Sequence, residues 1–179
     1  MNINTRGYDR LSYVLVVDDD STLLKFFKIH LNKFFSKVLV VKNAKEAINT
    51  IKEKEIDLVI SDISMSRMDG IQLMKKIQRF DPSIPVFLIS GALLSDDQRE
   101  EINTNADGFL KKPFSIDELH DFINRGMIHR DIYKKVHELV PNKKKFLELV
   151  KGKYDPNEIK NEDLRNKIDT LISDLRQAS

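Results

Sequence analysis

The chain has 179 residues, of which 41% are hydrophobic and 32% charged, a balance typical of a soluble globular protein with one domain and an appendage. It contains no cysteine, which excludes disulfides and thiolate metal sites, and no apolar run approaches the roughly 20 residues of a membrane-spanning helix. The first ten residues lack the apolar core of a signal peptide, so we expect a cytoplasmic protein with no membrane partner.

Short apolar runs alternate with amphipathic stretches from about residue 12 onward. Runs of this kind, bounded by helical periodicity, predict strands of a buried parallel sheet. The expected strands cover residues 14–17, 38–41, 57–61, 84–89 and 108–110. We expect Ser21 to cap the first helix and Gly70 to take a positive φ in a turn with Asp69. Ser115 and Glu118 are expected to form a capping box at the start of the fifth helix.

Alternation of strands and helices predicts an α/β fold with helices on both faces of the sheet. Right-handed crossovers then favour a doubly wound, flavodoxin-like sheet of five strands in the order 2-1-3-4-5. The helix expected over residues 95–105 is very polar, and Ile102 is its only strongly apolar residue. Such a helix would be only marginally stable.

The last 55 residues predict a helical extension rather than a second α/β unit. The fifth helix is expected to run on through Gly126 until Pro141, and a short helix to follow around residues 146–150. A final helix is expected to begin at Asp155, with Pro156 and Glu158 in its first turn. Its apolar face comprises Ile159, Leu164, Ile168, Leu171, Ile172 and Leu175. We therefore divide the chain into residues 12–125 and a helical extension of residues 126–179.

Polar side chains follow four of the apolar runs at the points where they end. They are Asp18, Asp19, Asp62, Ser90 and Lys112. The carboxyl ends of parallel strands form one edge of the sheet, where ligands bind in open α/β folds. Carboxylate oxygens suit Mg²⁺, a carboxylate can attack phosphorus, and an ammonium group neutralises phosphoryl oxygens. This set predicts a site for a divalent cation and a phosphoryl group.

Each of these residues has a plainer interpretation when it is considered alone. The acids at 18–20 could only cap a helix, Asp62 and Ser90 could belong to ordinary turns, and Lys112 could be a solvated charge. The joint pattern favours the site, because the residues stand at the ends of four separate strands in the expected order.

The chain resembles the receiver domains of bacterial two-component response regulators. The resemblance rests on Val16–Asp19, Ser61–Met65 with Met68–Gly70, Ile89–Gly91 and Ala106–Phe114. It implies that Asp62 accepts a phosphoryl group from a histidine kinase or phosphotransfer protein. It implies that Mg²⁺ is held by Asp18, Asp19, Asp62 and the backbone carbonyl of Ser64.

The resemblance also implies how phosphorylation is sensed. Ser90 and Lys112 would contact the phosphoryl group, and Phe109 would be the aromatic switch residue that turns inward. The helix over residues 95–105, the fifth strand and the fifth helix would form the output surface. The chain departs from the family pattern at Ser66, where proline is usual, at Gly91 for alanine and at Phe109 for tyrosine. None of these changes removes a group that phosphorylation needs, and we expect a phosphoacceptor rather than an enzyme.

The role of the extension is left open by the sequence. We favour an interaction or homodimerisation module, in which the apolar stripe of the last helix is buried against a partner chain or back on the receiver. A DNA-binding output is the weaker alternative, because residues 125–179 carry a net charge of +4, with 13 basic and 9 acidic residues, but no helix-turn-helix. Its basic residues include Lys143, Lys144, Lys145, Lys151 and Lys153.

Two further alternatives concern activity. A catalytic output is disfavoured, and His129 and His137 are expected to lie on the surface rather than to form a phosphotransfer pair. The receiver itself could instead be a phosphorylation-independent protein-interaction module that has kept the fold, but it retains all five chemical groups.

Overall fold

The computed structural model describes residues 13–151, 159 and 161–178. Five parallel strands form one sheet, in the expected order β2-β1-β3-β4-β5. The strands are β1 (Tyr13–Val17), β2 (Lys37–Val41), β3 (Leu58–Asp62), β4 (Val86–Ser90) and β5 (Gly108–Lys111). The helices that follow the strands are α1 (Ser21–Leu31), α2 (Ala44–Glu53), α3 (Gly70–Phe80), α4 (Asp96–Asn105) and α5 (Ile116–Leu139). The α/β prediction is confirmed.

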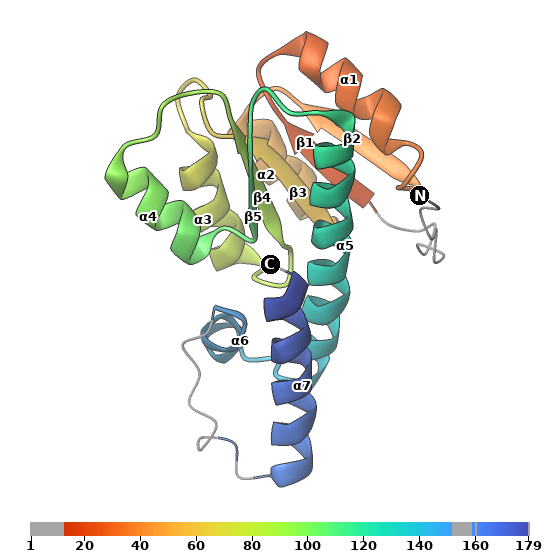
Figure 1. The fold of residues 1–179 in the computed structure, drawn as a ribbon, viewed down its shortest axis with the longest axis vertical. Coiled ribbons are helices and arrows are strands. Elements are labelled where there is room, and N and C mark those ends of the chain that lie inside the picture. Colours follow the sequence, from red (N-terminus) through yellow and green to blue (C-terminus); the bar gives the residue numbers. More distant parts are fainter. Residues whose placement is uncertain (1–12, 152–158, 160, 179) are drawn as a thin grey trace.

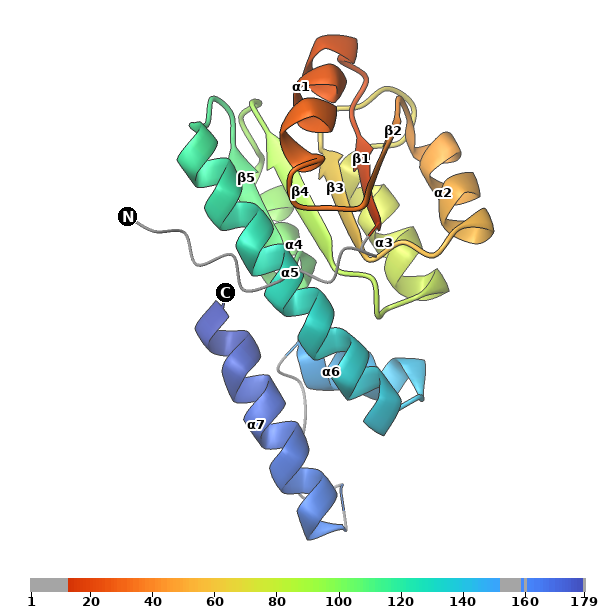
Figure 2. The same ribbon diagram turned by 90° about the vertical axis from the view of Figure 1, so that its right-hand side faces the viewer.

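Helices cover both faces of the sheet, as Figures 1 and 2 show. Alternate residues of β1 enter different cores, because successive side chains of a strand point to opposite faces. Val14 and Val16 pack with α1 and α5, whereas Leu15 and Val17 pack with α2 and α3. The polar α4 contributes a single buried residue, Ile102, to the second of these cores. None of the described helices is long and apolar enough to span a bilayer.

Two local predictions were wrong. The first helix is capped by Asp20 rather than Ser21, because the Asp20 side chain accepts hydrogen bonds from the amides of Thr22 and Leu23. Gly70 is the first residue of α3, and Asp69 caps that helix by accepting from the Gln72 amide. Among the described non-glycine residues, positive φ occurs only at Arg67, whose φ is 70°.

Glycine at position 70 is instead required by close packing. A Cβ atom there would lie 2.3 Å from the carbonyl oxygen of Asp62, at the end of β3. The amide of Gly70 also donates a 3.0 Å hydrogen bond to the carbonyl of Ile63. The start of α3 therefore lies directly against the strand end that carries Asp62.

The extension is built on α5, which runs without a break past Gly126 and ends before Pro141, as expected. It continues with α6 (Lys143–Val150) and α7 (Glu162–Ala178). The capping box expected at Asp155–Glu158 falls outside the described residues, but the expected start of the last helix was wrong. Ile159 and Asn161 are not helical, and α7 begins at Glu162, where the Asn161 side chain accepts a hydrogen bond from the Leu164 amide. The capping box of Ser115 and Glu118 at the start of α5 is confirmed.

A third apolar core lies within the extension. It joins α5, α6 and α7 through Ile132, Tyr133, Val136, Phe146, Leu149, Ile168, Ile172 and Leu175. In Figure 1, α7 runs antiparallel beside the lower half of α5, and its C-terminal end points back toward the sheet. The apolar stripe of the last helix is therefore buried within the same chain.

Candidate functional site

The carboxyl ends of β1, β3 and β5 bring Asp18, Asp62 and Lys112 together. The ammonium nitrogen of Lys112 lies 2.6 Å from Oδ1 of Asp62 and 3.0 Å from Oδ2 of Asp18. Both carboxylates are nearly buried, with 3% of Asp18 and 6% of Asp62 exposed. In the sequence, Asp18 lies 94 positions and Asp62 lies 50 positions before Lys112. This contact gathers two of the three acids and the one basic group that the sequence placed at this edge.

Burial governs the protonation of this cluster. It raises the pKa of the Asp18 carboxyl, although hydrogen bonds from the Asp20 amide and from Lys112 act in the opposite direction. Burial also disfavours the charged form of Lys112, but hydrogen bonds to Asp62 and Asp18 outweigh it and raise the Lys112 pKa above 10.5. An additional positive charge beside the two acids would relieve the cost of keeping Asp18 ionised.

Asp19 and Ser64, the other predicted metal ligands, do not enter this contact. Both are exposed, Asp19 beside the end of β1 and Ser64 in the loop after β3. No group of three or more acidic, histidine or cysteine side chains within the described part of the chain is arranged to hold a metal ion. The two buried carboxylates, Asp18 and Asp62, nevertheless fit Mg²⁺, which binds oxygen and usually takes only one or two carboxylates from a protein.

Ser90 and Phe109 lie in different surroundings from each other. Ser90 is 1% exposed at the end of β4, and its hydroxyl accepts a 3.1 Å hydrogen bond from the Ala92 amide. Phe109, on β5, is half-buried against the core that includes Ile102, and Leu94 packs against the same core. Its ring is therefore on the α4 side of the sheet rather than among the charged groups.

The loop after Asp62 is held by backbone hydrogen bonds. The amide of Met65 donates to the carbonyl of Ile63, and the amide of Met68 donates to the carbonyl of Ser66. Ile63 and Met65 are buried, whereas Ser66 is exposed. At the other side of the site, Gly91 gives more room than Gly70: a Cβ atom there would lie 3.3 Å from Cβ of Lys112.

Two clusters, each built around one buried acid, lie at the opposite, amino-terminal ends of the strands and were not predicted from the sequence. Asp57 precedes β3, and its side chain accepts hydrogen bonds from the Tyr13 amide, Arg130 and Lys134. Burial opposes its ionisation, but these partners outweigh burial and lower the Asp57 pKa below 3.8. Arg130 and Lys134 are one helical turn apart on α5, which lies far from Asp57 in the sequence, so only the acid directly before a buried strand was available as a signal.

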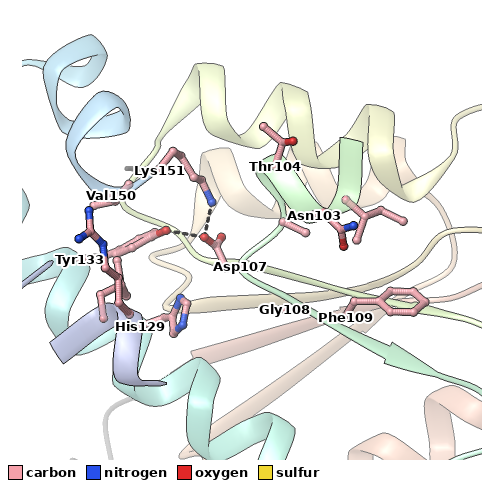
Figure 3. Close-up of a pocket in the computed structure, with 13 residues that line it drawn as sticks. Asn103, Thr104, Asp107, Gly108, Phe109, His129, Tyr133, Val150 and Lys151 are labelled. Carbon is pink, nitrogen blue, oxygen red and sulfur yellow. Dashed lines mark hydrogen bonds and ion pairs between the residues drawn. The ribbon is translucent and has the colours of Figure 1, made fainter. Parts of the chain in front are cut away.

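The second of these, which we call the Asp107 cluster, consists of Asp107, Tyr133 and Lys151. Asp107 precedes β5 and accepts hydrogen bonds from the Tyr133 hydroxyl and the Lys151 ammonium group, as Figure 3 shows. Its other carboxylate oxygen accepts a 2.7 Å hydrogen bond from the Val86 amide. Burial, together with the charge of Asp107, raises the Tyr133 pKa well above 10.

The structure corrects two expectations for the extension, one for Lys151 and one for His129. Lys151 is paired with a buried acid, and its side chain is only 11% exposed, so it is not a free basic group for nucleic acid. His129 is buried rather than on the surface, because its ring packs between Phe87 and Tyr133. Burial lowers the His129 pKa below 6.5.

Comparison with known proteins agrees with this geometry. A family model described as the response regulator receiver domain matches residues 14–124. The chain is 34% identical to the transcriptional regulatory protein ZraR of Klebsiella oxytoca and 32% identical to the transcriptional regulatory protein GlrR of Escherichia coli K12, each over 116 residues. These matches cover 65% of this chain but only 26% of either relative, so the chain spans about a quarter of their length.

Solved structures show the same fold. A response regulator receiver domain protein from Clostridium thermocellum superposes with a TM-score of 0.62 at 27% identity, covering 68% of this chain and 98% of that one.

Proposed function

Because this chain belongs to the response regulator receiver domain family, a family of phosphoacceptor signalling domains, we propose that Asp62 accepts its phosphoryl group. The donor is a phosphohistidine of a histidine kinase or phosphotransfer protein. The observation that carries this assignment is the contact of Lys112 with Asp62, since it places a cation beside the one buried carboxylate at the end of the central strand β3.

In the transfer step, a carboxylate oxygen of Asp62 forms a bond to phosphorus while the phosphorus–nitrogen bond of the donor breaks. The electron pair of that bond returns to the imidazole nitrogen. Lys112 lies where it can stabilise the charge on the transferring oxygens, and such electrostatic stabilisation supplies most of the catalysis in phosphoryl transfer. The step itself needs no other side chain of this protein to carry a proton.

Asp18, Asp19, Asp62 and the Ser64 carbonyl are the groups that we propose hold Mg²⁺. When bound, this ion would neutralise negative charge on the phosphoryl oxygens. The raised pKa of Asp18 supports a cation here, because burial makes an isolated carboxylate costly. Asp19 follows Asp18 directly in the sequence and is exposed, so its carboxylate is accessible to an ion from solution.

Phosphorylation would add roughly one and a half to two negative charges at the end of β3. Lys112 would then bond to the phosphoryl oxygens in place of the carboxylate, and the Ser90 hydroxyl would turn from the Ala92 amide toward them. Phe109 would follow by turning inward. The modification shifts the population between two arrangements because it interacts differently with each.

The test uses beryllofluoride, a phosphoryl analogue, together with Mg²⁺ and the full chain. Fluorine NMR of the bound analogue should give a signal for the wild type and for Asp97→Asn, an exposed acid on α4 that serves as the control. Asp62→Asn should give no such signal. A wild type without bound analogue, or an Asp62→Asn protein that binds it equally well, contradicts the proposal.

Other roles of the chain are weaker proposals. Homodimerisation was expected from the apolar stripe of the last helix, but that stripe is buried against α5 and α6. For DNA binding, exposed basic residues such as Lys144 remain available, whereas Lys151 is paired with Asp107. Light scattering with and without beryllofluoride, and a mobility shift at low salt, test these two roles. We propose that the protein is cytoplasmic, because that is where the histidine kinase or phosphotransfer protein would phosphorylate it.

A further inference from the structure

The Asp107 cluster joins the receiver to its extension at one buried point. Asp107 belongs to the receiver, Tyr133 lies on the lower half of α5, and Lys151 caps the C-terminal end of α6. Only 2% of the Asp107 side chain and 11% of the Lys151 side chain are exposed. A charge pair in such surroundings stabilises only when its geometry is good, because each ion has lost its water.

A cavity of about 410 Å³ adjoins this cluster and is shared by receiver and extension. The end of α4 contributes Asn103 and Thr104, and the end of α7 contributes Leu175 and Arg176. Figure 3 shows Asp107 beside Lys151 and Tyr133, just before β5, and the ring of Phe109 farther along on that strand. The predicted switch residue therefore lines the same space as the residues that hold the extension.

Strand β5 also connects the cluster to the proposed phosphorylation site. Asp107 precedes β5 and Lys112 follows it. The two residues are five positions apart in sequence, which corresponds to about 16 Å of extended chain. At its carboxyl end Lys112 bonds to Asp62, and at its amino end Asp107 bonds to Lys151. A displacement of β5 that follows Lys112 would move Asp107 as well.

The side of β5 that faces α4 offers little resistance to such a displacement. Ile102 is the only buried residue of α4, and β5 is an edge strand whose partner among the described strands is β4 alone. The cavity leaves room beside Phe109 for the ring to change position. Elements with few buried contacts are those that move most readily.

We propose that the Asp107 cluster holds α6 and α7 against the receiver in the unphosphorylated protein, and that phosphorylation of Asp62 weakens this hold. This inference rests on the function proposed above. The described arrangement has Lys112 bonded to the Asp62 carboxylate and Lys151 bonded to Asp107, so both contacts belong to the same state. Movement of Lys112 toward a phosphoryl group disturbs β5, and the buried pair of Asp107 and Lys151 is displaced with it. The helical extension is thus the element released to act on a partner.

Coupling of this kind is reciprocal. If phosphorylation weakens the Asp107 cluster, then weakening the cluster by mutation must favour the phosphorylated arrangement. Lys151→Gln removes the positive charge from the cluster. Its matched control is Lys144→Gln on the same helix, where the side chain is 88% exposed and lies 3.8 Å from Glu148. Tyr133→Phe removes only the hydroxyl and keeps the ring, and it serves as a milder second variant.

Amide hydrogen exchange of the full chain measures the hold directly, with and without beryllofluoride and Mg²⁺. In the wild type, saturating beryllofluoride should speed exchange in α6 and α7 by roughly tenfold or more. Lys151→Gln should show fast exchange there without the analogue, and Tyr133→Phe an intermediate rate, while Lys144→Gln behaves as the wild type. By linkage, Lys151→Gln should also bind beryllofluoride more tightly, by roughly fivefold or more.

The outcomes separate this inference from the proposed function. If the analogue binds the wild type but exchange in α6 and α7 stays the same, the inference is overturned and the function stands. If Lys151→Gln and Tyr133→Phe exchange no faster than Lys144→Gln, the cluster does not hold the extension. Absence of analogue binding in the wild type overturns both.

Discussion

Gly70→Ala tests whether the start of α3 fixes the position of the proposed acceptor. The added Cβ atom would lie 2.3 Å from the Asp62 carbonyl oxygen, and 3.0 Å from the Asp62 carbonyl carbon and from Cα of Ile63. Ordinary van der Waals contact begins at 3.4 Å, so the closest pair must separate by a further 1.1 Å. The atoms that clash are all backbone, and no side chain can turn aside to relieve them.

Overpacking of this kind costs about 1–3 kcal/mol, and alanine recovers up to about 1 kcal/mol of that through its helix propensity. We expect a net loss of about 2 kcal/mol, which in a chain of this size lowers the melting temperature by about 4–8 °C. Because α3 must move away from the acceptor strand, binding of beryllofluoride should weaken as well.

Thermal unfolding followed by circular dichroism, together with fluorine NMR of bound beryllofluoride, measures both effects. Gly91→Ala is the matched control, because its Cβ atom would meet only the Lys112 side chain, at 3.3 Å. That variant should lose less stability than Gly70→Ala. If Gly70→Ala melts with the wild type and binds the analogue equally well, the close approach of α3 to β3 does not constrain the site.

Three further predictions follow from single residues. Lys112→Met should slow phosphorylation of Asp62 by acetyl phosphate at least about tenfold, measured by intact mass, since charge stabilisation of this kind is the main catalytic contribution. Because the Lys112 pKa is raised, the stability that Lys112 contributes is complete below pH 10.5 and falls as the pH rises through its pKa in the folded state. The free energy of unfolding of Lys112→Met, measured by urea titration, should therefore not show this decrease at alkaline pH. Asp57→Asn breaks a buried ion pair and should cost about 3–5 kcal/mol in urea unfolding. The lowered Asp57 pKa means that its contribution is present above pH 3.8 and is lost as the pH falls below that value, so wild type and variant should converge in acid. Ser66→Pro should raise stability by about 0.4–1 kcal/mol in a thermal melt by stiffening the exposed loop, and no change or a loss would mean that proline does not fit there.

The sheet and its order were predictable because buried parallel strands are short apolar runs and the connections between them are handed. The strand-end groups were predictable for the same reason, since topology alone brings Asp18, Asp62 and Lys112 to one edge. Local detail was less secure. Asp20 and Ser21 are both good capping residues, and the sequence offers no means of choosing between them. Gly70 was attributed to a turn because its actual role, contact with another strand, depends on tertiary packing.

The extension was predictable as helices but not as a docked unit. The heptad-like spacing of its apolar residues indicated a buried face, without indicating whether a partner chain or the same chain would cover it. Lys151 and His129 were read as surface residues, because lysine and histidine usually are. Their burial depends on contacts with Asp107 and Phe87, which are distant in sequence.

The central claim is that Asp62 is the phosphoacceptor of this chain. Its most direct test is mass spectrometry of the intact protein and of its peptides after incubation with acetyl phosphate and Mg²⁺. We predict one phosphoryl group per chain, located on the peptide that contains Asp62 and absent from Asp62→Asn. Modification at another residue, or no modification of a wild-type chain that is folded by circular dichroism, would contradict the account.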